Sequence, residues 1–118
     1  MYDAFNAGER SSALAVLDPE VVWDFTDAPD GLVYHGHDEV RRFWASLDED
    51  WESLRIDVEA QEEHGDVVIC EVRVVGHGRG NKISIEHGET HVWHLHEGKL
   101  VEGKIYLDPD RAKAAAAS

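Results

Sequence analysis

Apolar residues in the middle of the chain recur at a helical spacing. Val40, Phe43, Trp44 and Leu47 stand at positions i, i+3, i+4 and i+7, so they share one face of a helix. Asp38 precedes them, in a first turn where the helix dipole favours an anion. The pattern predicts one amphipathic helix in this region, with its apolar stripe turned towards a core.

The segment before this helix predicts two shorter helices and a strand. The first helix starts within the chain's first residues, is short, and ends at Gly8, since glycine readily adopts the left-handed conformation that closes a helix. Ser11 or Ser12 can cap the second helix, which Asp18-Pro19 ends. The next β-prone run forms a short strand whose one face carries Val21, Trp23 and Phe25.

The second half of the chain alternates apolar and polar residues, which is typical of half-buried strands. Strands are expected over residues 54–60, 67–76, 82–96 and 100–107. The turns between them fall around Gly65, over the glycine-rich residues 76–81, and at Glu97-Gly98, a plausible two-residue hairpin loop.

The strand expected over residues 82–96 is too long to stay straight. It would span roughly 50 Å, whereas a compact chain of this length has a diameter on the order of 35 Å. The sheet must therefore curl, and Gly88 and Gly103 are candidate bulge or bend positions. The predicted fold class is α+β, a curved antiparallel sheet with a pocket between it and the N-terminal helices. It forms a single domain over residues 1–118, with residues 112–118 as a weak helix end or frayed tail.

The same strand carries a polar group among apolar neighbours. His87, Glu89 and His91 have the parity of the inward apolar residues, which are Ile83, Ile85, Trp93 and Leu95. The inner faces of the adjacent strands are expected to carry Val68, Cys70, Val72 and Val74, and Val101, Gly103, Ile105 and Leu107. A carboxylate beside imidazoles can transfer protons or bind a ligand. Catalysis, ligand binding and purely structural pairing all remain open.

Metal binding is not expected from these histidines. The Cα atoms of His87 and His91 would stand ~13 Å apart on a strand, too far for one zinc ion with bonds of ~2 Å. The chain shows no glycine-rich phosphate loop, nucleophile elbow or catalytic triad, so no cofactor is expected.

Aromatic residues supply candidate walls for the pocket. Trp23 and Trp93 are expected on elements that face each other across it, with Phe25 beside them. Tyr34 and His35 could add polar contacts to a ligand, together with His87. The same aromatic side chains would also suit an ordinary core.

Charge and composition limit the classes of partner that the protein is expected to bind. The chain has 11 basic and 25 acidic residues and a net charge of −14, which argues against nucleic acid and anionic membranes. The single cysteine excludes an intramolecular disulfide framework. No apolar run reaches ~18 residues, and no secretory signal is visible, so a cytoplasmic protein is expected.

Several motifs, in their order along the chain, resemble the SnoaL-like branch of the nuclear transport factor two-like superfamily. They are YDAFNAG at 2–8, LDPEVVW at 17–23, YHGHDEV at 34–40, HVW at 91–93, GKLV at 98–101 and YLD at 106–108. The resemblance implies a cone-shaped α+β fold with an apolar pocket and frequent homodimers. The superfamily includes ketosteroid isomerases, polyketide cyclases, epoxide hydrolases and members without catalysis, so the fold alone does not imply an activity.

The resemblance also allows a comparison of catalytic positions. The tyrosine of the isomerases falls at Met1, and their general-base aspartate falls at Phe25, with Asp24 and Asp27 nearby. Their second aspartate matches His91. Cyclase-like members use an acidic residue on the pocket strands, where Glu89 is the inward carboxylate that this sequence offers.

These observations predict a homodimer that binds a small apolar molecule, as an isomerase or cyclase with acid–base chemistry at His91 and Glu89. The alternative is a non-catalytic ligand-binding or dimerisation module. A purely structural dimer would instead show an apolar patch on the outer sheet face, to which Val67, Ile69 and Val75 could contribute.

Overall fold

A computed structural model describes residues 1–27, 31–80 and 82–117 of the 118-residue chain. The helices in these residues are α1 (Tyr2–Asn6), α2 (Arg10–Ala15), α3 (Gly36–Asp50) and α4 (Pro109–Ala117). The strands are β1 (Leu17–Asp24), β2 (Val33–His35), β3 (Trp51–His64), β4 (Val67–Gly78), β5 (Ser84–His96) and β6 (Lys99–Tyr106). Over these ranges, every helix is too short or too polar to span a bilayer.

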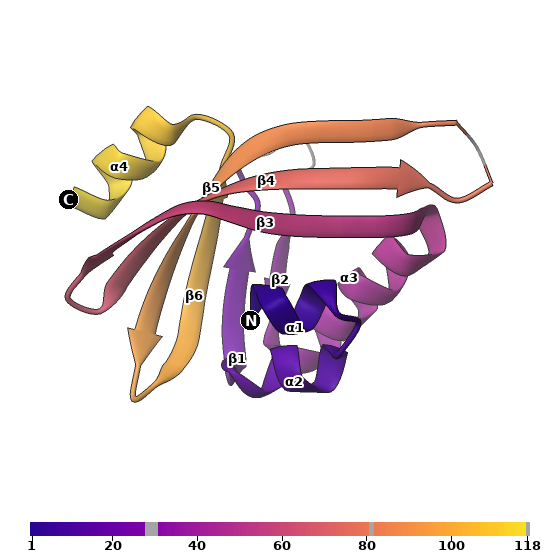
Figure 1. Cartoon of the computed structure of the whole chain (residues 1–118). Helices are drawn as coiled ribbons and strands as arrows, with labels where there is room; N and C mark the ends of the chain where they lie inside the picture. The colour runs from indigo at the N-terminus through magenta and orange to yellow at the C-terminus, as the bar shows by residue number, and fades with distance from the viewer. Residues whose placement is uncertain (28–30, 81, 118) are drawn as a thin grey trace.

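The strands form one curved sheet in the order β2-β1-β6-β5-β4-β3 (Figure 1). The predicted α+β class and the curl of the sheet are confirmed. One pair departs from the prediction, because β1 and β6 are parallel while the other neighbours are antiparallel. A parallel pair needs a long crossover, and the chain from β2 to β5 supplies it.

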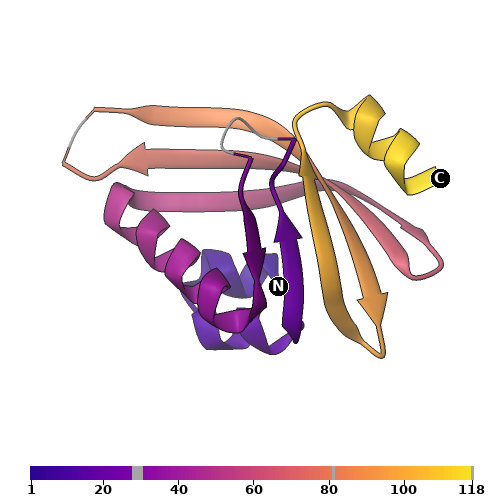
Figure 2. The same cartoon turned by 180° about the vertical axis from the view of Figure 1, so that it is seen from behind.

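Helices cover the sheet on two sides. Helices α1, α2 and α3 lie on the concave side, and α4 lies on the opposite side (Figures 1 and 2). Ala112 of α4 packs with Ile69 and Val92 on the outer face. The apolar patch that a purely structural dimer would show is therefore covered around Ile69 by the chain's own helix. Residues 112–117 of the predicted weak helix end or frayed tail belong to α4, and Ser118 lies outside the described residues.

The sheet has no bulge at the glycines that the sequence suggested. Gly88 pairs with Arg73 and Gly103 pairs with Trp93 in regular register, so the prediction of bulges there is wrong. The register instead shifts on β3 between Val58 and Ala60, and at the His94–Leu95 step of β5. An extra residue on one strand increases local twist.

The start of β1 also differs from the prediction. Helix α2 has Glu9 as its N-cap and no capping side chain, and it ends at Ala15, so the predicted serine cap and the proline stop are both wrong. Pro19 lies inside β1, where the pairing with β6 skips from Leu17 to Val22. A proline has no N–H to donate to the ladder, which explains the interruption.

Most of the predicted inner faces are confirmed as core. Cys70, Val72 and Val74 are buried on β4, and Ile105 is buried on β6. Two positions are corrected. Ile83 precedes β5 and is 58% exposed, and Leu100 takes the inward place expected for Val101 because the register shifts beside it.

The turns follow the predicted chemistry in part. Glu97 and Gly98 both have positive φ, at 51° and 79°, which is the conformation of a two-residue hairpin turn. Gly8 follows α1 as predicted. The turn expected over residues 76–81 begins later, because β4 continues to Gly78, and Asn81 lies outside the described residues.

Candidate functional site

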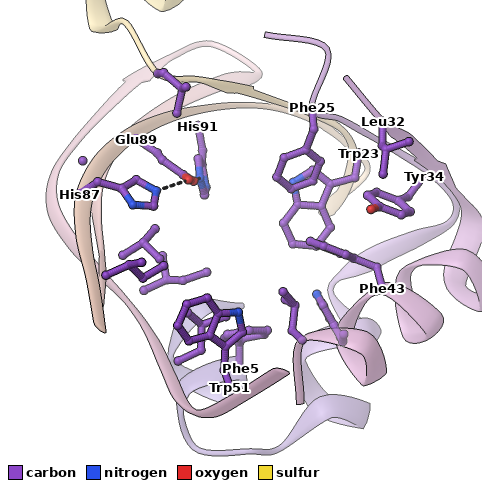
Figure 3. Close-up of a pocket in the computed structure, with 18 residues that line it drawn as sticks. Phe5, Trp23, Phe25, Leu32, Tyr34, Phe43, Trp51, His87, Glu89 and His91 are labelled. Carbon is purple, nitrogen blue, oxygen red and sulfur yellow. Dashed lines mark hydrogen bonds and ion pairs between the residues drawn. The ribbon is translucent and has the colours of Figure 1, made fainter. Parts of the chain in front are cut away.

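A cavity of about 600 Å³ opens between the concave face of the sheet and the helices (Figure 3). Most of its lining is aromatic or aliphatic. The apolar side chains that line it are Phe5, Trp23, Phe25, Leu32, Tyr34, Phe43, Trp44, Leu47, Trp51, Leu54, Ile56, Val74, Ile85 and Leu107. The volume suits a drug-sized organic molecule.

Local sequence explains the aromatic wall. The i, i+3, i+4 spacing on α3 turns Phe43 and Trp44 towards the sheet, while alternation on β1 turns Trp23 inward. The Tyr34 and Phe43 rings stack with centroids 4.4 Å apart, and Trp23 and Phe25 stack at 5.7 Å. These contacts build a closely packed apolar side of the cavity.

The opposite side of the cavity is polar. His87, Glu89 and His91 project from one face of β5, across the void from Trp23 and Phe25 (Figure 3). The Glu89 carboxylate binds both histidines, with Oε2 2.8 Å from His87 Nε2 and Oε1 2.9 Å from His91 Nε2. The predicted His-x-Glu-x-His face is therefore one hydrogen-bonded cluster.

Behind the cavity wall, the cluster continues to a residue that sequence reasoning missed. The Tyr2 hydroxyl lies 2.6 Å from His91 Nδ1, and Trp93 Nε1 donates a hydrogen bond of 2.8 Å to the same hydroxyl. In the comparison with isomerases, the position of their tyrosine corresponds to Met1, which is one residue before Tyr2. One residue turns a side chain by about 100° around a helix, so a shift of one place decides whether the hydroxyl meets the sheet.

A pair of backbone contacts holds Tyr2 in place. The Asn6 side chain donates from Nδ2 to the Ile56 carbonyl at 2.8 Å and accepts from the Ile56 N–H at 2.9 Å. It thereby satisfies both backbone groups of one β3 residue. Helix α1 is docked on β3 by these bonds, and its Tyr2 reaches across to β5.

The ionisation of the cluster follows from its surroundings. Burial alone would raise the pKa of Glu89, but the interactions with His91 and His87, above all the hydrogen bond with His91, outweigh burial and lower it. Burial raises the pKa of the Tyr2 hydroxyl well above its ordinary value, and it also raises the pKa of the Cys70 thiol. The cavity thus presents a carboxylate, backed by a protonated tyrosine.

The structure separates the candidate residues into two groups. Glu89, His91 and His87 line the cavity, as do the predicted wall residues Trp23 and Phe25 and the predicted polar contact Tyr34. His35 and Trp93 do not line it. The His35 side chain lies at an exposed position, and its backbone N–H binds Glu39. Trp93 is buried behind the wall, where its ring fills the space over Gly103.

Wall residues from other elements were not singled out from the sequence as ligand contacts. Phe5 comes from α1 and Phe43 from α3. Phe43 was visible as part of the helical stripe, but its position at the cavity depends on how α3 crosses the sheet. Within the described ranges, no group of three His, Cys, Asp or Glu side chains could hold a metal ion.

The fold and the site define a cone-shaped α+β domain with an internal pocket, and the chain belongs to the SnoaL-like domain family. The family profile matches residues 1–103. No protein with a curated description matches the chain.

Solved structures share the whole architecture. A nuclear transport factor 2-like protein of unknown function from Burkholderia pseudomallei K96243 is 25% identical, with a TM-score of 0.81 over 96% of this chain and 88% of its own. TerC, co-crystallised with polyporic acid, is 18% identical, with a TM-score of 0.80 over 99% and 92% of the two chains. A protein of Jannaschia sp. CCS1 named as a SnoaL-like polyketide cyclase is 20% identical, with a TM-score of 0.76 over 97% and 84%. At 18% and 20% identity, the similarities to TerC and to the Jannaschia protein show a shared fold alone.

Proposed function

We propose that this protein binds a small, largely apolar molecule in the cavity and moves a proton on it, in an isomerase-like or cyclase-like reaction. One observation carries the proposal: a single carboxylate, bound by two imidazoles, faces a void of about 600 Å³ that is otherwise walled by aromatic and aliphatic groups. Titratable groups in such a cleft are the usual sign of acid–base chemistry.

The ligand class follows from the lining. Among the lining residues of the described chain, Glu89 is the one acidic group, and no lysine or arginine is present. An anionic ligand would meet an uncompensated carboxylate in an apolar space, which is costly. A neutral molecule with flat apolar faces and an acidic C–H or O–H fits the aromatic wall and can turn its polar edge towards Glu89.

The chemistry is proton abstraction next to a carbonyl. Glu89 takes a proton from the carbon next to the carbonyl, and the electron pair of the broken C–H bond passes into an enolate. Return of the proton to another carbon of the conjugated system completes an isomerisation. Alternatively, attack of the enolate carbon on a carbonyl within the same molecule forms a ring, and the resulting alkoxide takes the proton back from Glu89. The similarity to a SnoaL-like polyketide cyclase and to a protein crystallised with polyporic acid supports a cyclic, carbonyl-bearing ligand.

Hydrogen–deuterium exchange tests this function without knowledge of the natural substrate. 2-Tetralone and a steroid enone are incubated with the protein in D2O, and loss of the proton signals next to the carbonyl is followed by NMR. We expect catalysed exchange in the wild type. Glu89→Gln should slow it at least about 100-fold, because a positioned general base contributes on that scale or more.

The matched control is Glu86→Gln. Glu86 lies on the same strand but is exposed on the other face, so the substitution removes an equal charge without touching the cavity. His91→Ala should also abolish exchange or weaken binding while the protein remains folded. Equal exchange rates in the Glu86 and Glu89 variants would rule out Glu89 as the base.

Binding without turnover is the second candidate, and the lowered pKa of Glu89 favours it, because a weakly basic carboxylate with two imidazole partners is well suited to hold a ligand donor. In that case the two ketones, or phenols such as 2-naphthol, would raise the melting temperature of the protein. No exchange would be catalysed, and Glu89→Gln would weaken the thermal shift.

A further inference from the structure

The hydrogen-bond chain behind the cavity has a direction that its donors determine. An indole N–H can only donate, so the 2.8 Å bond from Trp93 Nε1 makes the Tyr2 oxygen an acceptor. Burial raises the pKa of Tyr2, so the hydroxyl keeps its own hydrogen. That hydrogen needs an acceptor, and His91 Nδ1 lies 2.6 Å from the oxygen.

The far side of the same imidazole supports this direction. His91 Nε2 lies 2.9 Å from Glu89 Oε1, and Glu89 is a carboxylate that can only accept. A hydrogen on Nε2 satisfies that contact, whereas a lone pair there would face the lone pairs of the carboxylate. Neutral His91 therefore carries its hydrogen on Nε2 and accepts at Nδ1.

A charged His91, with hydrogens on both nitrogens, is the competing arrangement. It would send a second donor to the Tyr2 oxygen, and the Tyr2 hydrogen would then turn to the Cys70 thiol, which stands beside it. Sulfur is a weak acceptor.

We propose that Tyr2, oriented by Trp93, is a positioning residue that fixes the tautomer of His91, with the hydrogen on Nε2 and Nδ1 as the acceptor. Tyr2 does not line the cavity and touches no ligand there. Its effect reaches the cavity through the imidazole, because Nε2 donates to Glu89 while the lone pair of the ring, on Nδ1, faces Tyr2 and not the ligand. A ligand proton that enters this part of the cluster is therefore received by Glu89.

The tautomer of His91 is a property of the protein without a ligand, and only the transfer of a ligand proton to Glu89 rests on the proposed function. The test is a long-range proton–nitrogen correlation spectrum of the ¹⁵N-labelled full chain at neutral pH, with the His91 signals assigned from a His91→Gln sample. We expect Nδ1 in the range of an unprotonated imidazole nitrogen and Nε2 in the protonated range. A protonated Nδ1 would overturn the proposal.

Two variants report on the Tyr2 contact. In Tyr2→Phe, the Nδ1 resonance should move further from the protonated range, because the hydroxyl no longer donates to it. Exchange of 2-tetralone should fall about fivefold, the effect of one ordinary hydrogen bond. Tyr106→Phe removes a hydroxyl on β6, outside the cluster, and Cys70→Ala removes the competing acceptor. Both should leave the His91 signals unchanged.

The outcomes separate the two claims. If no ketone exchanges but His91 shows the expected tautomer, the proposed reaction fails and the positioning role of Tyr2 stands. If exchange is catalysed while Nδ1 is protonated, or while Tyr2→Phe leaves the Nδ1 signal where it was, the positioning role is refuted and the reaction stands. A change of the signals in Cys70→Ala would show that the thiol, and not the imidazole, receives the Tyr2 hydrogen.

Discussion

Gly103 lies on β6 directly opposite Trp93 of β5, and its missing side chain leaves room for the indole ring. A Cβ atom at this position would stand within 2.7 Å of Trp93 Cε3 and Cη2, and closer still to Cζ3. Atoms of a buried ring cannot approach a methyl group so closely. Gly103→Ala must therefore displace Trp93, whose indole nitrogen holds the Tyr2 hydroxyl.

The cost has two parts. Overpacking a core of native density costs about 1–3 kcal/mol, and loss of the hydrogen bond between Trp93 and Tyr2 adds about 1 kcal/mol. We expect Gly103→Ala to lower the free energy of unfolding by about 2–4 kcal/mol, measured by urea denaturation. The variant should also change the NMR signals of His91, since Tyr2 loses its orienting partner.

Gly88→Ala is the matched control. Gly88 also lies in a strand without a left-handed backbone, and a Cβ there would meet only the Val72 carbonyl oxygen, at an ordinary 3.8 Å. This variant should keep its stability or gain up to about 1 kcal/mol, because alanine restricts the unfolded chain. Equal stability of the two alanine variants would refute the packing argument. The double variant Gly103→Ala/Trp93→Phe should recover part of the loss, as coupled neighbours do.

Three further expectations follow from single contacts. Asn6→Leu should cost about 2 kcal/mol in urea denaturation, because two partly buried backbone groups of β3 lose their partners. Leu17→Ala, at a position 1% exposed, should cost about 2–5 kcal/mol, while Val16→Ala at 37% exposure should change stability by less than about 0.5 kcal/mol. Hydrogen bonding to Arg111 lowers the pKa of Asp27 below 3.8, the value expected in the unfolded chain. The ionised Asp27 therefore stabilises the fold fully above pH 3.8, and this stabilisation is lost as the pH falls through the pKa of Asp27 in the folded protein. Acid should therefore destabilise the wild type more than Asp27→Asn, and parallel pH profiles of unfolding would contradict this.

Sequence reasoning failed where contacts join distant segments. Trp93 was assigned to the cavity because its strand was expected to face the strand of Trp23 across it, yet the ring lies in the core behind the wall and contacts Gly103. Tyr2 was missed because its partner, His91, is 89 residues away. The sequence does contain an indication of the role of Tyr2. Tyr2 begins a short helix whose Asn6 is bound to β3, and both residues lie in the YDAFNAG motif.

The features that local periodicity governs were readable without coordinates. The apolar stripe of α3 depends on the side-chain period of a helix, and the shared face of His87, Glu89 and His91 depends on that of a strand. Both periods can be recognised directly in the sequence. The curl followed from chain length against domain size. Tertiary structure alone decided the parallel pairing of β1 with β6, the burial of Ile69 beneath α4 and the bond between Tyr2 and His91. These depend on register and on the crossing of separate elements, which the burial of the whole core selects and no single segment encodes.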